Sequence, residues 1–457
     1  MKKLLSQLRR EIPQVGSVIG GPDIPVVFGG DKWFAASKPD AVVFPQSAND
    51  VAAVMRIAAK QGVAVTPRGA GFGYVGGCVP LSGGIVLAME RMNKILEIHD
   101  RDFVAVVQPG VITGDLQARV RRKGMFYPPD PASLSDCSLG GNIATNAGGP
   151  RCLKYGVTRN YVLGLEVVLA DGSVVRMGGR THKNKTGFDL VGLFVGSEGL
   201  LGVVTEATLR LLPHPPARAV LSAGFQDMRA ATRAIRAVFK AGFLPAACEV
   251  ADAFTLNAAR NFRPDAAFPP GSAHVLIEID GQAASVKSEV LAMARLLREA
   301  KATGIRTATD EASCQALWDL RRAFSMSLKA TGLRKLNEDI VVPRGRLVDL
   351  VAFASRLQKS SGFPIACFGH AGDGNIHVNI MVGDYDDPAI RAKADRALDA
   401  LFSQVIAWNG AITGEHGVGI AKMPWWNQAL SPENRALHKT IKTALDPDAR
   451  LNPGKFV

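Results

Sequence analysis

A glycine-rich run, PRGAGFGYVGG, occupies residues 67–77. Its structure decides between two classes of nucleotide-binding fold. Its glycines at positions 71, 73 and 76 spell G-x-G-x-x-G, the fingerprint of a Rossmann unit when a strand precedes it and a helix comes after it. A β-rich run does precede it at 63–66, and Glu90 lies near the offset expected for a ribose-binding acid. The segment beyond the last glycine therefore decides between a nicotinamide enzyme and another class.

The residues after Gly76 argue against a Rossmann unit. They read GCVPLSGGIVLAM, with Pro80, Gly83 and Gly84 where a helix would have to continue. Proline and glycine interrupt helices, so the segment predicts a loop that feeds a strand at 84–88. We expect any phosphate here to be held by backbone N–H groups of the loop, without a helix. A glycine-rich turn with no ligand is the alternative.

Composition and charge exclude several functions. The chain of 457 residues is long enough for two or three domains, and no apolar run reaches the ~18 residues of a membrane span. The start, MKKLLSQLRREIP, lacks the apolar core of a signal peptide. Six cysteines without a CxxC pair predict reduced thiols and no iron–sulfur cluster. We therefore expect a cytoplasmic protein, not an integral membrane protein, with peripheral binding at the inner membrane face as an option.

The net charge of +13 is spread along the chain, and the basic residues are not interleaved with aromatic ones. This pattern argues against nucleic-acid binding. It is compatible with docking on an acidic partner protein or a membrane surface, and equally with a merely solvated basic face.

The order of elements predicts an α+β protein of three segments, 1–214, 215–410 and 411–457. The tandem prolines after His214 mark the first boundary because they stop both helix and strand. A glycine-rich loop at 410–419 begins a tail that is expected to return to a shared site. The individual elements expected are a helix capped by Asn49 or Asp50, a helix capped by Thr113, a hairpin turned at Asp171-Gly172, and helices near 285–303, 345–359 and 389–407.

A second glycine-rich stretch, DPASLSDCSLGGNIATNAGG, occupies residues 130–149. Glycines allow a flat ligand to approach the backbone, and the Asn and Thr side chains can orient a polar ring edge. Two such loops predict an extended cofactor with a phosphate end and a ring end.

These two stretches, together with GSEGLLGVVTE at 196–206, resemble the FAD-binding domain of the vanillyl-alcohol oxidase/p-cresol methylhydroxylase superfamily. The chain is most similar to the branch that contains the glycolate oxidase catalytic subunit, D-lactate dehydrogenase and D-2-hydroxyglutarate dehydrogenase. The resemblance implies a two-subdomain FAD-binding domain, an α+β substrate (cap) domain and a C-terminal tail that returns to the flavin. FAD is expected to be non-covalent, because Cys78 stands near where many relatives carry a tethering histidine. The implied FAD contacts are Pro67, Arg68, Gly69, Ala70, Gly71 and Gly73 for the pyrophosphate, Pro131, Ser138, Gly141, Asn142, Thr145 and Gly148 for the flavin, Gly202 and Val204 for the adenine end, and Asn452.

The segment FGHAGDGNIHVNI at 368–380 predicts a β-hairpin with a four-residue loop. His370 would then oppose Asn375, and His377 would lie diagonally beside His370 on the same face. Two imidazoles at that spacing can share one metal ion, although two unrelated histidines near a turn are the plain alternative.

The segment GEHGVG at 414–419 adds a carboxylate, Glu415. Two histidines and one carboxylate with open positions are a catalytic ligand count, which fits Zn, Mn or Fe. The resemblance implies the same divalent-metal ligands, His370, His377 and Glu415, with His416 as the base. It also implies that Arg321 holds the substrate carboxylate; Ser325, Lys335 and Asn375 are weaker substrate candidates. Where the 2-hydroxyglutarate enzymes carry a lysine this chain has Asn337, which favours smaller substrates.

These features predict an FAD- and metal-dependent dehydrogenase that oxidises a small D-2-hydroxy acid, D-lactate or glycolate, by hydride transfer to flavin N5. Because the chain encodes no cluster, an external acceptor is expected: an electron-transfer flavoprotein, an iron–sulfur subunit or a quinone. The alternatives are a catalytically idle FAD-binding subunit of a glycolate-oxidase-like complex, a D-2-hydroxyglutarate dehydrogenase, a flavoprotein oxidase of an unrelated alcohol and, more distantly, a nicotinamide enzyme. The sequence leaves the oligomeric state open.

Overall fold

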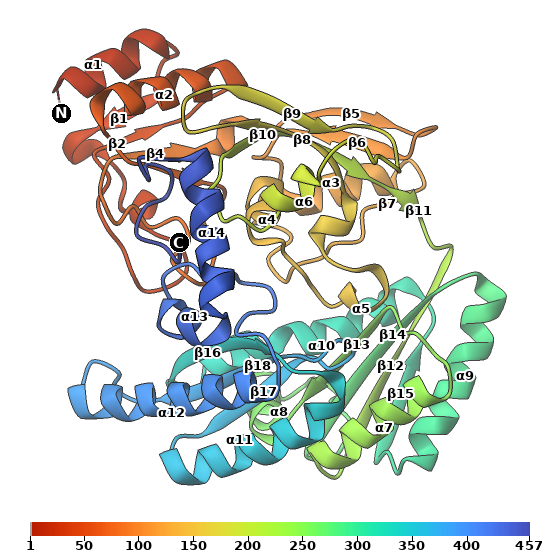
Figure 1. Ribbon diagram of the computed structural model, residues 1–457. Coiled ribbons are helices and arrows are strands. Elements are labelled where there is room, and N and C mark those ends of the chain that lie inside the picture. The colour runs from red at the N-terminus through yellow and green to blue at the C-terminus, as the bar shows by residue number, and fades with distance from the viewer. Residues whose placement is uncertain (1) are drawn as a thin grey trace. The chain divides into compact units, whose positions relative to one another are not determined.

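A computed structural model describes residues 2–457, which form two compact units. The first comprises residues 2–148, 157–214 and 415–457, and the second comprises 149–156 and 215–414. Both combine helices with sheets, which confirms the α+β class, and the C-terminal tail returns to the first unit (Figure 1). None of the helices within residues 2–457 combines the length and hydrophobicity needed to span a bilayer.

The first unit contains a four-stranded sheet in the order β1-β2-β4-β3, in which β4 runs parallel to both of its neighbours. Helix α2 (Ala48–Gln61) buries Val51, Val54 and Met55 in the core beside this sheet. Their spacing of three and four residues places them on one helical stripe. The strands are β1 (Val18–Gly20), β2 (Ala41–Val43), β3 (Val65–Arg68) and β4 (Ile85–Ala88).

Helix α2 begins earlier than predicted. Its N-cap is Ser47, whose hydroxyl accepts the N–H of Asp50 at 3.2 Å, while the Asp50 carboxylate accepts the N–H of Ser47 at 3.1 Å. The expectation that Asn49 or Asp50 caps the helix is therefore wrong, because Asp50 is the reciprocal partner in a capping box. Gly62 ends the helix with φ of 63°, a left-handed conformation that favours glycine.

The second sheet of the first unit is a five-stranded antiparallel sheet in the order β5-β6-β10-β8-β9. The predicted hairpin at Asp171-Gly172 is confirmed, since Val168 pairs with Val174 and Gly172 has φ of 84°. The strands are β5 (Ile95–His99), β6 (Val104–Val107), β8 (Val162–Val168), β9 (Val174–Gly178) and β10 (Val203–Arg210); β7 (Met125–Phe126) and β11 (Leu212–Pro213) pair separately.

Helix α3 (Thr113–Arg121) corrects a second expected cap. Thr113 is the first residue of the helix and Ile112 precedes it as the N-cap. The Thr113 hydroxyl donates to the Cys137 carbonyl at 3.4 Å and is fully buried, so it is unavailable for capping. The remaining helices of the first unit are α1 (Lys2–Glu11), α4 (Leu139–Thr145), α6 (Leu190–Phe194), α13 (Met423–Ala429) and α14 (Pro432–Leu445).

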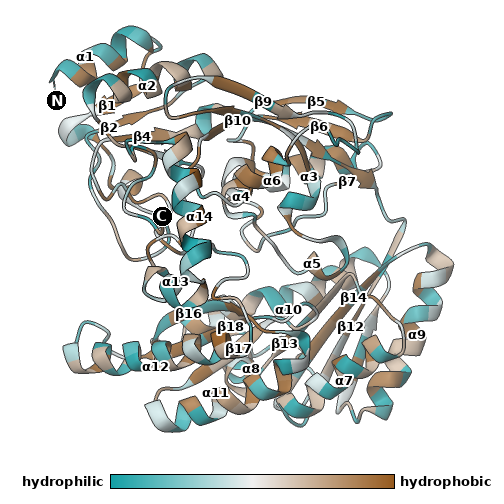
Figure 2. Ribbon diagram, in the orientation of Figure 1, coloured by the Kyte–Doolittle hydropathy of each residue, from teal (hydrophilic) through white to brown (hydrophobic). Residues whose placement is uncertain are grey.

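The second unit is built on a seven-stranded antiparallel sheet in the order β15-β12-β14-β13-β17-β18-β16. Figure 2 shows its strands as largely hydrophobic, whereas the helices of this unit alternate between hydrophobic and hydrophilic residues. The strands are β12 (Ala217–Phe225), β13 (Ala247–Ala251), β14 (Ala273–Gly281), β15 (Gly304–Ala308), β16 (Arg334–Val341), β17 (Ile365–His370) and β18 (Asn375–Val382). The helices are α5 (Cys152–Tyr155), α7 (Met228–Lys240), α8 (Ala253–Phe262), α9 (Ala283–Glu299), α10 (Glu311–Lys329), α11 (Leu347–Ser361) and α12 (Pro388–Ala407).

The strand register aligns polar side chains from five strands on one face of this sheet. Directly paired residues share a face, and so do residues two apart along a strand. The pairs Ala247–Glu278, Ala251–Phe368, Phe368–His377 and Asp339–His377 thereby join the strands through a common face. That face carries Glu278, Glu249, His370, His377 and Asp339, and apolar side chains of α8 and α10 pack against it.

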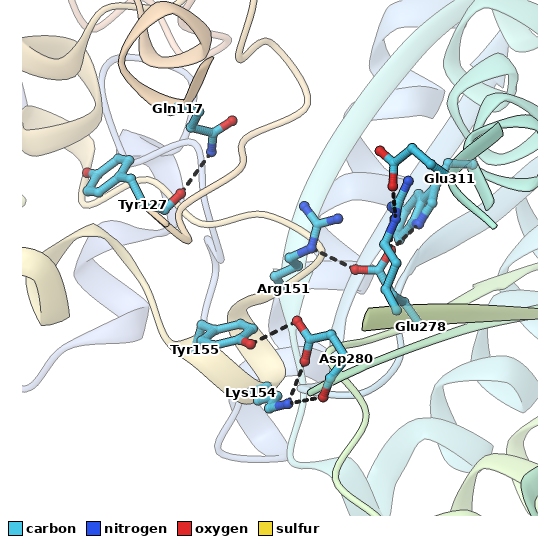
Figure 3. Close-up of polar contacts among 10 residues, drawn as sticks. Gln117, Tyr127, Arg151, Lys154, Tyr155, Glu278, Asp280 and Glu311 are labelled. Atoms are coloured by element: carbon cyan, nitrogen blue, oxygen red, sulfur yellow. Dashed lines mark hydrogen bonds and ion pairs between the residues drawn. The ribbon is translucent and has the colours of Figure 1, made fainter. Parts of the chain in front are cut away.

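The short helix α5 belongs to the second unit although its chain neighbours belong to the first. Arg151 Nε lies 2.8 Å from a Glu278 carboxylate oxygen, Lys154 Nζ lies 2.5 Å from Asp280, and the Tyr155 hydroxyl donates to Asp280 at 2.8 Å (Figure 3). Glu278 and Asp280 stand two residues apart on β14, so both point to the face that α5 contacts.

Candidate active site

The two glycine-rich segments of the first unit meet at one hydroxyl group. Ser138 caps α4 by accepting the N–H of Gly141 at 3.3 Å, and the same oxygen accepts the N–H of Ala70 at 3.2 Å. A Cβ atom on Gly69 would lie only 2.5 Å from this oxygen. Glycine is therefore required at position 69 for the two segments to approach each other.

The loop after β3 has the features of an anion-binding loop. Gly71 has φ of 73°, a left-handed conformation that favours glycine and that occurs in anion-binding backbone nests. Arg68 is buried and donates from its two amino groups to the carbonyls of Val27 at 3.2 Å and Gly69 at 3.3 Å. Its Nε atom has no hydrogen-bond partner within residues 2–457. Half-buried Pro67 and exposed Gly73 complete the predicted loop.

The second stretch is not the continuous loop that was expected. Residues 139–145 form helix α4, because Ser138 caps its start and Asn146, with φ of 51°, ends it. The Asn142 side-chain amide donates to the Thr113 hydroxyl at 2.6 Å, and the Thr145 hydroxyl donates to the Gly141 carbonyl at 3.2 Å. Both polar side chains are therefore engaged in hydrogen bonds to residues of the first unit.

The other predicted FAD contacts lie in the first unit. Asn452 is buried and donates to the carbonyls of Gly77 at 2.8 Å and Glu198 at 2.9 Å; its carbonyl oxygen has no partner within residues 2–457. Gly202 is buried, and a Cβ there would lie 2.5 Å from a Val167 side-chain carbon. Pro131 and Val204 are half-buried and Gly148 is buried.

Glu198 anchors the loop that carries His416, and sequence reasoning missed it. Its two carboxylate oxygens accept the N–H groups of Val418 at 2.7 Å and Gly419 at 2.8 Å, so it spans 220 residues of sequence. Burial raises its pKa to about 7, against the opposing effect of these two N–H groups. The His416 ring stacks on Tyr74, with 5.4 Å between ring centroids.

The predicted hairpin is confirmed. Strands β17 and β18 are joined by the four residues 371–374, and His370 pairs with Asn375 as expected. His377 lies on the same face, 5.7 Å from His370 between ring centroids. Both histidines are buried, so each imidazole has been removed from bulk water.

One ligand atom from each of His370, His377 and Glu415 lies within 4.8 Å of the other two. Two imidazole nitrogens and a carboxylate oxygen are donors that Zn, Mn and Fe accept. Glu415 directly follows Gly414, whose N–H donates to Asp339 at 2.9 Å. The other Asp339 oxygen accepts from the Asn375 amide at 2.7 Å, so Asp339 joins the hairpin to the segment that ends at Glu415.

Glu249 is a second residue that sequence reasoning missed. One of its oxygens lies 2.7 Å from His370 Nδ1, and the other accepts from Arg321 Nε at 2.6 Å. Burial opposes its ionisation, but attraction to His370 and Arg321 holds its pKa at about 2. Arg321 is buried on α10 and is bound by the same carboxylate that contacts the candidate metal ligand His370. A glutamate inside the apolar strand ACEVA is the signal that could have been noticed.

Of the weaker substrate candidates, Lys335 lies on β16 and Asn375 on β18 of the same sheet, and Ser325 lies on α10. Lys335 donates to the Ser325 hydroxyl at 2.9 Å, and burial lowers the pKa of Lys335 to about 8. Asn375 donates to Asp339, while its carbonyl oxygen is buried without a hydrogen-bond partner within residues 2–457. The side-chain carbonyl oxygens of Asn337 and Asn379 are also buried without a hydrogen-bond partner within residues 2–457. These two residues pair with each other across β16 and β18.

Two protein families match this chain. Residues 39–178 match the family described as FAD binding domain, and residues 214–456 match FAD linked oxidases, C-terminal domain. The chain thus carries an FAD-binding domain, and the second match covers more than half of its length.

Relatives along nearly the whole chain carry the names of hydroxy-acid enzymes. The glycolate oxidase subunit GlcD of Bacillus subtilis is 39% identical over 92% of this chain and 89% of its own. D-lactate dehydrogenase of Anaerostipes hadrus is 31% identical over 96% and 94%, and D-2-hydroxyglutarate dehydrogenase of Stutzerimonas stutzeri is 33% identical over 99% and 98%.

The fold is similar to that of p-cresol methylhydroxylase with substrate bound, with a TM-score of 0.80, 20% identity, and coverage of 100% of this chain and 96% of the other. At that identity the similarity concerns the fold alone. Together with the family matches and the relatives, it shows that this chain belongs to the FAD-linked oxidases, in the branch of glycolate oxidase subunit GlcD, D-lactate dehydrogenase and D-2-hydroxyglutarate dehydrogenase.

Proposed function

We propose that this protein is an FAD- and divalent-metal-dependent dehydrogenase that oxidises a small D-2-hydroxy acid to the 2-oxo acid. The observation that carries the proposal is the His370, His377 and Glu415 cluster in a chain with an FAD-binding domain. The names of the three relatives support the 2-hydroxy-acid class. An idle FAD-binding subunit would not need two buried histidines and a half-buried glutamate gathered at one place.

The residues divide the chemistry between them. A bound divalent ion would lower the pKa of the substrate hydroxyl, and bound FAD would accept the α-hydrogen as a hydride at N5. His416 is proposed to take the hydroxyl proton, because imidazole is the side chain most often used as a general base. Arg321 is proposed to bind the substrate carboxylate: its Nε is engaged by Glu249, which leaves the two amino groups for the substrate.

FAD is proposed to bind non-covalently in the first unit. The loop of residues 67–73 would hold the pyrophosphate through the N–H groups of residues 68–73. Residues 131–148 would hold the flavin, and Gly202, Val204 and Asn452 the remainder. The orphaned Arg68 Nε and Asn452 oxygen are buried polar atoms that a ligand would satisfy. Cys78 offers no ready thiolate for a covalent bond, since burial raises its pKa to about 12.

The substrate is proposed to be D-lactate or glycolate, because Asn337 replaces the lysine of the 2-hydroxyglutarate enzymes. A buried cation keeps D-2-hydroxyglutarate as a second candidate. Ser325 lies on α10 one turn beyond Arg321, and Lys335 on β16 donates to its hydroxyl, so a second carboxylate could be received there.

Anaerobic flavin bleaching tests the activity and the substrate together. The purified yellow protein is mixed without oxygen with D- and L-lactate, glycolate, malate and 2-hydroxyglutarate, and the flavin absorbance is monitored. We expect D-lactate or glycolate to bleach it fastest, and removal of metal with EDTA to abolish bleaching until Zn²⁺ or Mn²⁺ is returned. Bleaching at full rate after EDTA would contradict the metal mechanism, and bleaching by no 2-hydroxy acid would favour the idle subunit.

The electrons are proposed to leave through an external acceptor, namely an electron-transfer flavoprotein, an iron–sulfur subunit or a quinone. None of the six cysteines, all within the described residues 2–457, forms a disulfide, and they are spread over both units. An iron–sulfur cluster needs several cysteines at one place.

A further inference from the structure

We infer that Glu249 is a positioning residue that aims the metal ligand His370 and the carboxylate-binding Arg321 from a single carboxylate group. The inference rests on the proposed function, because it assigns a role toward that metal and that substrate. Nothing in the sequence motifs points to this residue, which lies 121 residues before His370.

Glu249 fixes the tautomer of His370. A carboxylate can only accept hydrogen bonds, so the nitrogen 2.7 Å from Glu249, Nδ1, carries the proton. In a neutral imidazole the other nitrogen, Nε2, then holds the lone pair that a metal requires. A carboxylate–histidine pair of this kind fixes the ring orientation and makes the ligand more basic.

Arg321 is oriented by the same carboxylate. Its Nε donates to the other oxygen of Glu249 at 2.6 Å, and the guanidinium lies against the rings of Phe324 and Phe368, 5.7 and 5.0 Å from their centroids. One bond and two ring contacts leave the guanidinium little freedom. The direction in which its amino groups point is thus set by Glu249.

The buried charge of Glu249 is stabilised by both of its partners. Glu249 is fully buried, and an isolated carboxylate in such a place would be strongly destabilised. It is compensated by one formal cation, Arg321, and by the His370 N–H, both within hydrogen-bond distance. A divalent ion bound by His370 would polarise the imidazole and strengthen its hydrogen bond to Glu249.

Glu278 provides a matched control on the same face of the same sheet. It is 1% exposed, close to the 0% of Glu249, and it also accepts from several side chains: Arg151 at 2.8 Å, Arg218 at 3.0 Å and Trp318 at 2.6 Å. None of these donors is a histidine. Glu→Gln at either position therefore perturbs a buried ion pair, but only one of them touches a metal ligand.

The experiment is a Mn²⁺ titration of the FAD-loaded, EDTA-treated full-length protein, monitored by the electron paramagnetic resonance signal of free Mn²⁺. We expect Glu249→Gln to weaken Mn²⁺ binding by about 10- to 100-fold, as is typical when the partner of a ligating histidine is lost. Glu278→Gln is expected to bind Mn²⁺ like the wild type. At saturating Mn²⁺, Glu249→Gln should still show a raised KM for the 2-hydroxy acid that bleaches the flavin, because Arg321 has lost its anchor.

Equal Mn²⁺ affinity of Glu249→Gln and the wild type would overturn the inference, and so would equal weakening by both glutamine variants. Glu249→Asp serves if the glutamine variant does not fold: the shorter carboxylate keeps its charge but cannot reach both partners, so unchanged affinity in this variant also overturns the inference. Absence of Mn²⁺ and Zn²⁺ binding by the wild type is a different result, which removes the metal from the proposed function and the role of Glu249 with it.

Discussion

Glu198 is the residue whose protonation should be visible in the stability of the protein. Burial raises its pKa to about 7, whereas the pKa of an unfolded glutamate is near 4.5. Between these values the folded state binds more protons than the unfolded state, so the free energy of unfolding falls as pH rises from 4.5 to 7. The full difference corresponds to about 3 kcal/mol.

Replacing Glu198 with glutamine should remove this dependence, because glutamine stays neutral throughout the range. Thermal melts at several pH values would show a flatter Tm-against-pH curve for Glu198→Gln than for the wild type between pH 4.5 and 7.5. Glu299→Gln, at an exposed position on α9, is the control and should behave like the wild type. Parallel curves for wild type and Glu198→Gln would mean that Glu198 is ionised over the whole range.

The residue scale also shows where sequence reasoning stops. His370, His377 and Glu415 are recognisable because they stand in glycine-flanked motifs, and His370 and His377 share a hairpin. Glu249 and Glu198 are single carboxylates without a motif around them that indicates a partner. Each reaches its partner across more than 120 residues of sequence, a proximity that no local pattern encodes.

At the scale of elements, helix α2 offers a sharp test of capping. Ser47→Ala removes the acceptor of the Asp50 N–H and one half of the capping box, so the free energy of unfolding should fall by about 1 kcal/mol. Asn49→Ala, in the exposed first turn, should leave stability unchanged or slightly raised because alanine is the better helix former. Urea unfolding of the wild type and the two variants measures the difference. A larger loss of stability for Asn49→Ala would indicate that Asn49 is the N-cap, as the sequence suggested.

Elements with strong local signals were predicted well. The hairpin at Asp171-Gly172 and the metal-ligand hairpin have the expected turns because loop length sets strand register. The elements that differ are those whose ends depend on a distant contact. Thr113 is withdrawn from capping by Cys137, and glycine-rich α4 forms because Ser138 can cap it while also holding Ala70.

The net charge of +13 over the full chain makes electrostatic docking of an acidic electron acceptor testable with salt. If an acidic electron-transfer protein accepts the electrons, its reduction should slow as ionic strength rises, because added salt shortens the range of attraction between charged surfaces. Stopped-flow reduction of the isolated partner at about 10 to 300 mM salt measures this. Reduction of a small neutral quinone should not change over the same series, and an equally flat response of the protein partner would exclude electrostatic docking.

The sequence by itself determined the α+β class, the branch of the FAD-linked oxidases and the candidate ligands of the metal. It could do so because these depend on short segments whose turns, strand alternation and glycine positions act locally. The tertiary structure alone decided which side chains share one face of the seven-stranded sheet. That face joins residues from strands far apart in the chain, and only the register between those strands brings Glu249 to His370 and Arg321.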